Sequence, residues 1–315
     1  MPLALSPYAD EARDELLTLW GLALPLDAIT VDTLESRVLL DENFDPDTFL
    51  LARSDGMLVG FVLGVQAKRL PLGNADPAGD RCWITALGVH PGAQLDIVGD
   101  RLLKEVETRF KALGKRECRI SGYPPGYFTP GIDVRAYSSL LKFLRAHGYA
   151  DFHEALSMDA PIVLFTVPEK TVEIQGKLLS EGIEIRPYRR TDLVQFMEFL
   201  EKTMPSDWVR VERRNLRRIS EGGFRAEQVM VVTHQDGIIG YCQFEGSHFG
   251  PFGVSEAYQG RGIGTVLLAR TLERMRHEGH HDAWVLWTDD LAAKVYGKFG
   301  FKETRRFALL KKTLS

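Results

Sequence analysis

The sequence predicts a mixed-sheet α/β (α+β) fold that is built twice in tandem. The chain has 315 residues, about the length of two ordinary domains. Strand and helix patterns follow in the same order in both halves, and in each half a hairpin precedes a strand–helix–strand unit. A shift of 165 residues also aligns the chain with itself. This shift places Val89, Gln94, Gly99, Leu102 and Leu103 on Val254, Gln259, Gly264, Leu267 and Leu268.

In the first half, residues 48–53 and 57–66 are expected to form a hairpin around Ser54-Asp55-Gly56. A helix is expected from about residue 100 to 113, because apolar side chains recur on one stripe and Gly114 ends the pattern. The other expected elements are a strand at 82–89, a short strand at 119–121, a loop rich in Gly, Pro and aromatic residues at 122–133, and a helix that ends at His147-Gly148.

The second half repeats this order. Residues 229–234 and 237–245 are expected to form a hairpin around Gln235-Asp236-Gly237. The elements expected after it are a strand at 248–254, a helix at 262–278, a strand at 284–287, a helix at 291–299 and a last strand at 301–311. We therefore divide the chain into a first domain (1–155), a linker (156–182) and a second domain (183–315).

Charge and composition disfavour several classes of protein. The formal net charge of -4 disfavours a broad surface for nucleic acid or for an anionic membrane. No apolar run has the length of a membrane-spanning helix, and the N-terminal segment lacks the basic region of a signal peptide, so we expect a cytoplasmic protein. We expect a monomer or a homodimer.

Cysteine and histidine residues do not predict a metal site. Cys82, Cys118 and Cys242 are odd in number and form no CxxC pair, so reduced, buried thiols are expected. The histidines at 277, 280 and 281 have no Cys or carboxylate partner at ligand spacing.

The most informative segment is residues 250–265. Gly260, Gly262 and Gly264 alternate where a predicted strand passes into a helix, so backbone N–H groups can point outward beside a helix N-terminus. This arrangement suits a pyrophosphate, and Arg261 adds a charge-assisted donor. The segment lacks the Gly-Lys-Ser/Thr ending of a P-loop, and Thr265 stands where a Rossmann fingerprint needs its third glycine.

Two motifs resemble those of the GNAT N-acetyltransferase superfamily. Gln259-x-x-Gly262-x-Gly264, after the strand that ends in Phe252-x-Val254, is similar to the family's acyl-CoA-binding motif. Asp289-x-x-Ala292-x-x-x-Tyr296-x-Lys298-x-Gly300-Phe301 is similar to its second signature, which begins with Asn and ends in Gly-Phe. The resemblance covers about residues 183–315 well and the first half in outline.

The resemblance implies that acetyl-CoA is the co-substrate and that no metal takes part. Phe252 and Val254 would lie along the pantetheine as in a strand pairing, and Gln259 to Thr265 would hold the pyrophosphate. Asp289 stands near the pantetheine, where the family often has Asn. A backbone N–H near Val254 would hold the oxyanion. The full set of cofactor-binding residues that it implies is Phe252, Gly253, Val254, Gln259, Gly260, Arg261, Gly262, Ile263, Gly264, Thr265, Asp289 and Lys298.

The resemblance also implies the proton-transfer residues. Tyr296 would protonate the departing CoA thiolate. This transfer requires close placement, because a phenol has a pKa of about 10 and is a weaker acid than the thiol that forms. His248 occupies a position comparable to the catalytic Glu of the histone acetyltransferase branch and is one candidate for the general base. Glu245 is the alternative base, and a chain of water molecules is a third.

The first copy of the repeat is expected to lack this chemistry. Ile97 stands where the second copy has Gly262, Asp96 replaces Arg261, and Leu144 stands where Tyr296 stands. An acid that faces a pyrophosphate repels it.

The sequence thus predicts an acetyl-CoA-dependent N-acetyltransferase that acts on an amine of a small molecule or a peptide by direct transfer. The alternatives are a non-catalytic acyl-CoA-binding or scaffold protein, and an acyltransferase that uses another acyl-CoA.

Overall fold

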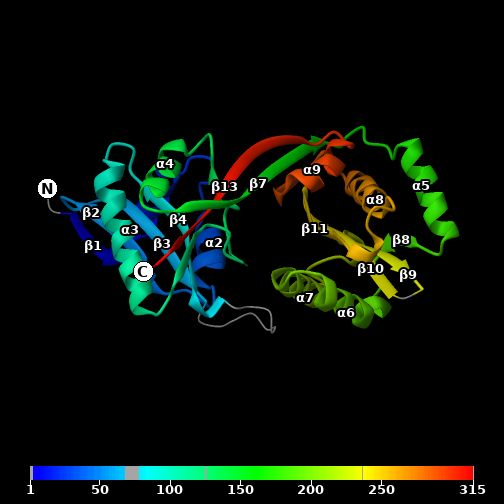
Figure 1. Cartoon of the computed structure of the whole chain (residues 1–315), viewed down its shortest axis with the longest axis horizontal. Coiled ribbons are helices and arrows are strands. Elements are labelled where there is room, and N and C mark those ends of the chain that lie inside the picture. The colour runs from blue at the N-terminus through cyan, green and yellow to red at the C-terminus, as the bar shows by residue number, and fades with distance from the viewer. Residues whose placement is uncertain (1–2, 68–77, 125, 236, 315) are drawn as a thin grey trace. The chain divides into compact units, whose positions relative to one another are not determined.

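The computed structural model describes residues 3–67, 78–124, 126–235 and 237–314. The chain forms two compact units. Unit 1 comprises residues 1–155 together with 306–315, and unit 2 comprises residues 156–305. Both units contain a mixed sheet flanked by helices, as the sequence predicts (Figure 1).

Unit 1 is built around the sheet order β1-β2-β3-β4-β5-β13. Strands β4 and β5 run parallel, and the other neighbours are antiparallel. Its elements are β1 (Leu3–Pro7), α1 (Arg13–Ala23), α2 (Val31–Leu34), β2 (Phe49–Ser54), β3 (Met57–Gln66), β4 (Arg81–Val89), α3 (Leu95–Ala112), β5 (Glu117–Ile120), β6 (Ile132–Asp133), α4 (Ser138–Ala146), the first part of β7 (Ala150–Pro161) and the last part of β13 (Lys302–Thr313).

Unit 2 is built around the sheet order β7-β12-β11-β10-β9-β8, in which β11 and β12 are the parallel pair. Its further elements are α5 (Glu169–Ser180), β8 (Glu184–Pro187), α6 (Leu193–Thr203), α7 (Ser206–Glu221), β9 (Val229–His234), β10 (Gly237–Glu245), β11 (His248–Val254), α8 (Ile263–His277), β12 (Asp282–Thr288) and α9 (Asp290–Gly297). Figure 1 shows α8 on one face of this sheet and α6 with α7 on the other.

The alternation of strand β10 explains why unit 2 has a core on each face of its sheet. Successive side chains of a strand point to opposite faces. Tyr241 packs into the cluster of α6 and α7, whereas Cys242 and Phe244 pack into the cluster of α8. All three side chains are fully buried.

The compact units differ from the predicted division of the chain at both ends of unit 2. The segment predicted as a linker, 156–182, contains the end of β7 and helix α5, and its apolar residues, such as Met158 and Leu178, lie in the core of unit 2. The last ten residues belong to unit 1, because β13 pairs with β5 from Leu310↔Ile120 to Thr313↔Glu117. At both ends, the unit in which the apolar side chains are buried determines where the boundary falls.

Most of the predicted elements are confirmed, with changed boundaries. The first hairpin turns at Asp55 and Gly56, which have φ angles of 49° and 81°. In the second hairpin Asp236 lies outside the described residues. Helix α3 begins at Leu95 rather than near residue 100, which matters for the comparison of the two units below.

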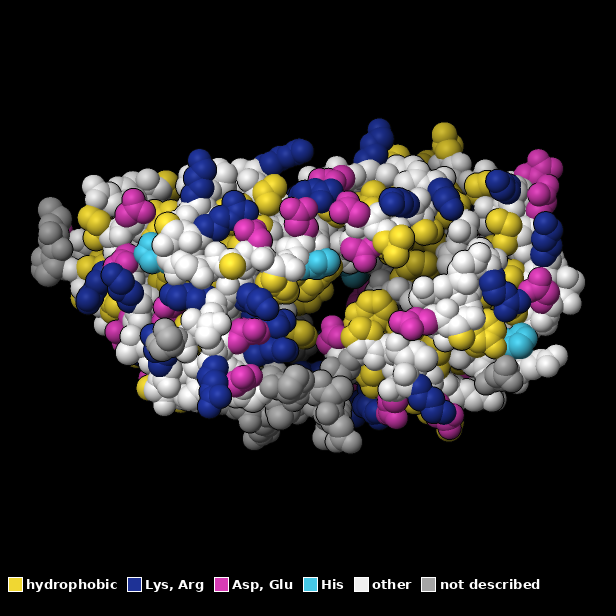
Figure 2. All heavy atoms as spheres, viewed as in Figure 1, with side chains coloured by type: hydrophobic (Ala, Val, Ile, Leu, Met, Phe, Trp, Pro, Cys, Tyr) yellow, Lys and Arg dark blue, Asp and Glu magenta, His cyan; other side chains and the backbone are white. Residues whose placement is uncertain are grey.

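Other expectations concern the cysteines, metal sites, membrane spans and surface charge. Cys82, Cys118 and Cys242 are buried free thiols, as predicted. Among the described residues, no three His, Cys, Asp or Glu side chains come together as a metal site. No helix in the described part of the chain combines the length and apolarity needed to cross a bilayer. On the face drawn in Figure 2, acidic and basic side chains are interspersed.

Candidate functional site

The parallel strands β11 and β12 part soon after they begin. Their pairing is His248↔Trp284, supported by a hydrogen bond of 2.9 Å from the Trp284 N–H to the Ser247 carbonyl. Strand β11 stays paired with β10 up to Gly240↔Val254. Among the described residues, the last ones of β11 therefore have a sheet partner on one edge only, and the other edge faces the opening between the two strands.

The backbone groups of Phe252 and Val254 face this opening. The Ser255 N–H donates to the Ile239 carbonyl of β10 at 2.8 Å. Because backbone groups alternate between the two edges of a strand, those of Phe252 and Val254 point to the edge that β12 has left. The side-chain amide of Gln259 donates to the Val254 carbonyl at 3.1 Å and closes the loop that follows the strand. The backbone groups of Phe252 can thus hydrogen-bond to an extended ligand chain, as they would to a neighbouring strand.

Two glycines shape the turn into α8. Gly260 and Gly262 have φ angles of 78° and 83°, in the left-handed region that favours glycine. Gly262 is the N-cap of α8, and no side chain of the described residues caps the helix. The first N–H groups of a helix have no partner within it, so this end of α8 offers donors to an anion.

Close packing accounts for other glycines at the site. A Cβ atom on Gly264 would lie 3.3 Å from the Phe252 ring, so this glycine lets α8 approach β11. A Cβ atom on Gly253 would lie 2.7 Å from the Met204 sulfur and 3.1 Å from Trp208. A side chain at Gly264 would need a small shift of the Phe252 ring, and one at Gly253 would need Met204 to move.

Arg261 already has an anionic partner in the protein. It forms an ion pair with Glu181, which follows the end of α5. Its guanidinium also lies over the Tyr258 ring, 5.7 Å from the centroid. A bound phosphate would compete with Glu181 for this cation.

Tyr296 packs at the inner end of the opening. Its ring lies edge-on to Phe249, at a centroid distance of 5.3 Å, and 5.9 Å from Phe252. Burial raises the pKa of the Tyr296 phenol well above its ordinary value, while a hydrogen bond with Thr288 at the end of β12 lowers it. The phenol therefore keeps its proton at neutral pH and can act as a donor.

The two candidate bases lie at the other end of β11. His248 is the first residue of the strand, and its ring packs 4.5 Å from that of Trp284. Phe252 lies four positions further along the chain, about 13 Å in a strand. Glu245, which pairs with His248 across the hairpin, forms a 2.8 Å ion pair with Arg218. Hydrogen bonding to Arg218 holds the pKa of Glu245 below its ordinary value, which makes this carboxylate a weak base.

The remaining predicted residues flank the opening. Asp289 is the N-cap of α9, and its side chain accepts from the Ala292 N–H at 2.7 Å. Lys298 is the exposed C-cap of the same helix. Ile263 is buried in the core at the start of α8, and Thr265 lies half-buried two residues on. Asp289 thus has a structural role in the protein itself.

Glu212 is a buried group that sequence reasoning did not single out. Its side chain on α7 is fully buried, and neither carboxylate oxygen has a hydrogen-bond partner among the described residues. Burial raises its pKa to about 8, with a small opposing effect of Arg214. A detectable signal existed, because Trp208, Glu212, Leu216 and Ile219 recur at helical spacing on the stripe that faces the sheet.

The corresponding segment of unit 1 has a different start to its helix. The C-caps of α3 and α8, Leu113 and Glu278, fall at matching positions, but α3 begins three residues earlier in the alignment. Residues 95–97 thus form an extra helical turn where unit 2 has the turn 260–262, and this turn carries Asp96. Leu144 of α4 is buried where α9 carries Tyr296.

The sheet with one parting parallel pair, a glycine turn at a helix N-terminus and a buried tyrosine define an acyltransferase of the acyl-CoA-dependent class. Comparison with known families agrees in both halves. The model described as acetyltransferase (GNAT) family matches residues 14–121, and the one described as acetyltransferase (GNAT) domain matches residues 225–303. The chain belongs to the GNAT acetyltransferases and contains two GNAT domains. No curated protein matches the sequence.

Solved structures share the fold at low sequence identity. A GCN5-related glucosamine N-acetyltransferase region of a fungal multi-domain beta-N-acetylglucosaminidase has a TM-score of 0.80 at 18% identity, with 98% of this chain and 38% of that chain covered. A GCN5-related N-acetyltransferase from Sphaerobacter thermophilus has a TM-score of 0.72 at 17% identity, covering 99% and 96%. A tandem GNAT protein from the clavulanic acid biosynthesis pathway has a TM-score of 0.63 at 18% identity, covering 100% and 99%.

Proposed function

We propose that unit 2 transfers the acetyl group of acetyl-CoA directly to an amine of a small molecule or a peptide. The observation that carries this proposal is the free edge of β11 at Phe252, which lies between the glycine turn of α8 and the Tyr296 ring. Acetyl-CoA supplies the activated acyl thioester. Among the structures of similar fold, one is described as a glucosamine N-acetyltransferase region, and a small amine such as an amino sugar is the acceptor class we favour.

The chain's own groups would hold the two ends of acetyl-CoA. The backbone of Phe252 and Val254 would pair with the pantetheine, whose amides suit strand-like hydrogen bonds. N–H groups from Gly260 to Gly264 would hold the pyrophosphate at the positive end of α8. Arg261 would contribute its charge after release from Glu181.

Tyr296 would donate its proton to the departing thiolate. Burial raises the pKa of this phenol and so makes it a weaker acid, which means that proton transfer depends on close placement of the hydroxyl beside the departing sulfur. No cysteine nucleophile is needed, which agrees with the burial of Cys242 and with the pKa of its thiol, which burial raises to about 12.

The amine must lose a proton during the attack. His248 is our candidate for this base, acting through water because of its position at the start of β11. Glu245 is a weaker candidate, because its ion pair with Arg218 stabilises the charged carboxylate.

A thiol-release assay with acetyl-CoA and a panel of amines, amino sugars included, tests the proposal. Tyr296→Phe should lower kcat at least tenfold, while calorimetry should find the affinity for acetyl-CoA within about twofold of wild type. Tyr188→Phe serves as a control, because Tyr188 is buried in the α6–α7 cluster. If acetyl-CoA binds but no thiol is released in the presence of any amine of the panel, the result would favour the scaffold alternative. Release from succinyl-CoA or propionyl-CoA alone would favour another acyl donor.

A further inference from the structure

A row of four side chains crosses the sheet of unit 2 where its parallel strands begin to part. Glu245 of β10 pairs with His248 of β11. His248 pairs with Trp284 of β12, which pairs in turn with Asp159 of β7. Directly paired residues of neighbouring strands point to the same face of a sheet. The row therefore presents a carboxylate, an imidazole, an indole and a second carboxylate on one face.

The row lies on the face of the sheet opposite to α8, and part of it is open. Neighbours of the row along the strands, such as Phe249, Ala283 and Ala160, are buried in the α8 cluster, so the row points to the other face. Helices α6 and α7 cover that face over β9 and β10 (Figure 1). Beyond them, Trp284 is 38% exposed, and Asp159 is exposed as well. A ligand can therefore reach the indole and the carboxylate of this end of the row.

The two carboxylates of the row differ in their partners. Glu245 forms an ion pair of 2.8 Å with Arg218 of α7. The Asp159 side chain forms no hydrogen bond or ion pair with another described residue. Trp284 stands beside Asp159 in the row, and the face of an indole attracts cations. This end of the row therefore favours a positively charged group.

The equivalent row of unit 1 has the opposite charge. The shift of 165 residues that aligns the two halves places Trp83 and Arg119 at the positions of the histidine and the indole. Arg119 pairs with Lys311 of β13, where the indole of unit 2 pairs with Asp159. Both cations lie over the Phe152 ring, 5.1 and 5.5 Å from its centroid. A cationic ligand is thus repelled by the row of unit 1 and attracted by that of unit 2.

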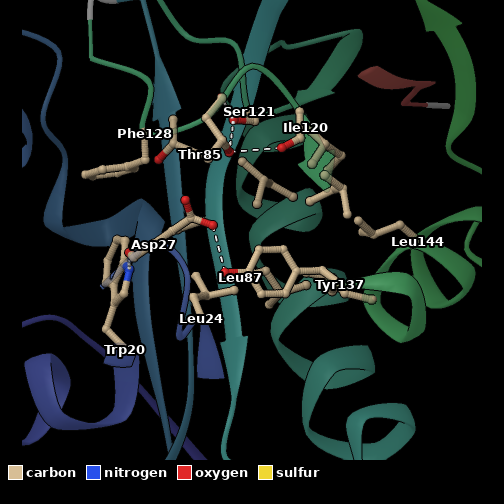
Figure 3. Close-up of a pocket in the computed structure, with 16 residues that line it drawn as sticks. Trp20, Leu24, Asp27, Thr85, Leu87, Ile120, Ser121, Phe128, Tyr137 and Leu144 are labelled. Atoms are coloured by element: carbon tan, nitrogen blue, oxygen red, sulfur yellow. Dashed lines mark hydrogen bonds between the residues drawn. The ribbon is translucent and has the colours of Figure 1, made fainter. Parts of the chain in front are cut away.

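The pocket of unit 1 is too small for such a ligand. Strands β4 and β5 part beyond Ile84↔Ile120, and the side chains drawn in Figure 3 line a pocket there. Its volume is about 30 Å³, room for about two water molecules.

We infer that the amine acceptor of unit 2 carries a second ammonium group and lies across this row. The second ammonium rests on the Trp284 ring and pairs with Asp159, while the reacting amine lies beside His248 at the opening between β11 and β12. Two strand spacings, about 10 Å, separate the Cα atoms of His248 and Asp159, and a short alkyl diamine suits this separation. The inference rests on the proposed acetyl transfer for its chemistry and adds the class of acceptor, a diamine.

Three acceptors that differ only in the group at one end test the inference in the thiol-release assay with acetyl-CoA. They are 1,4-diaminobutane, 4-amino-1-butanol and 4-aminobutanoate, which end in a cation, a neutral hydroxyl and an anion. We expect kcat/KM for the diamine to be about tenfold that for the alcohol, and the anion to be the poorest acceptor. Asp159→Asn should reduce the diamine to the level of the alcohol. Glu227→Gln, which removes an exposed charge just before β9, should leave the preference for the diamine intact.

A charge reversal guards against loss of folding in the first variant. Asp159→Lys should make 4-aminobutanoate a better acceptor than the diamine, a gain that an unfolded protein cannot show. Trp284→Leu should raise the KM for the diamine about threefold. The inference is wrong if the three acceptors have equal kcat/KM, if Asp159→Asn keeps the preference for the diamine, or if Asp159→Lys leaves the order of the acceptors as in wild type.

Binding without acetyl-CoA separates this inference from the proposed function. In an NMR titration, 1,4-diaminobutane should shift the indole N–H signal of Trp284, assigned by its loss in Trp284→Phe, and Asp159→Asn should abolish the shift. If the shift is present but no amine releases thiol, the proposed acetyl transfer fails and the row remains a diamine site. If amines release thiol but the Trp284 signal does not move, the acetyl transfer stands and the row is not the acceptor site.

Discussion

Gly262, the N-cap of α8, lies directly against Ile174 of α5: a Cβ atom at Gly262 would come within 2.8 Å of the Ile174 Cγ2 atom. The same atom at Gly260 would meet none of the described residues within 4 Å, although both glycines have nearly the same positive φ. The two glycines therefore separate backbone strain from steric conflict at one turn.

We predict that Gly262→Ala weakens acetyl-CoA binding more than Gly260→Ala. Both variants pay the cost of a left-handed backbone, about 1–2 kcal/mol, but only the first displaces α5 from the turn. Calorimetry with acetyl-CoA measures the difference. The double variant Gly262→Ala with Ile174→Ala should regain part of the lost affinity. Equal affinities for the two single variants would show that contact with Ile174 does not shape the turn.

The ion pair between Arg261 and Glu181 gives a second prediction. Glu181→Gln should lower the KM for acetyl-CoA by up to about fivefold, because an exposed ion pair is worth about 0.2–1 kcal/mol and no longer has to be broken. Arg261→Ala should raise the KM. Steady-state kinetics at low salt measures both effects.

The exposed Glu173 on the same helix provides the control for this pair. Glu173→Gln removes the same charge from α5 and should leave the KM unchanged. An equal fall of KM in both variants would indicate that the general charge of α5, not release of Arg261, sets the affinity.

Local patterns in the sequence predicted the parts of the fold that are determined locally. The first hairpin follows from Asp55-Gly56, which suits positive φ angles, and the start of α8 follows from the alternating glycines. The segment from Phe252 to Gly264 was predicted as one strand–turn–helix unit, and the structure places it so.

The features that could not be predicted depend on packing between residues that are far apart in the sequence. The pattern of residues 301–311 indicates a strand but not its partner, and pairing with β5 of unit 1 is set by contacts far along the chain. The pocket of unit 1 depends on Asp27, Ser121 and Tyr137 from three separate segments. Arg261 was predicted as a phosphate ligand, but its partner Glu181 lies in the segment predicted as a linker.

The buried Glu212 makes the stability of unit 2 depend on pH. Burial raises its pKa from the ordinary 4.5 to about 8, so the folded protein holds a proton that the unfolded chain releases. This contribution to stability is fully present below pH 4.5 and is lost as the pH rises through 8, by at most about 1.4 kcal/mol per pH unit. Glu212→Gln, which resembles the protonated acid, should match wild type near pH 5 and exceed its free energy of unfolding at pH 8.

Urea denaturation at pH 5, 6.5 and 8 measures this difference. Glu221→Gln is the matched control, since this exposed residue ends the same helix. Tyr241→Phe should change the free energy of unfolding little, because the buried Tyr241 hydroxyl has no hydrogen-bond partner among the described residues. A pH-independent effect of Glu212→Gln would contradict a raised pKa.

The end of β13 should stabilise unit 1 rather than unit 2, although it follows unit 2 in the sequence. Leu310 is fully buried opposite Ile120 of β5, and the Lys312 ammonium lies 2.7 Å from the buried Glu107 carboxylate of α3. Leu310→Ala should lower the free energy of unfolding of unit 1 by about 2–5 kcal/mol, the usual cost of a cavity at a buried leucine. Hydrogen exchange should accelerate in peptides of α3 and β5, and exchange in α8 should stay as in wild type.

Leu291→Ala is the control, because Leu291 is 74% exposed on α9 and its truncation leaves no cavity. Faster exchange in α8 and β12 instead would place the end of β13 in the stability of unit 2.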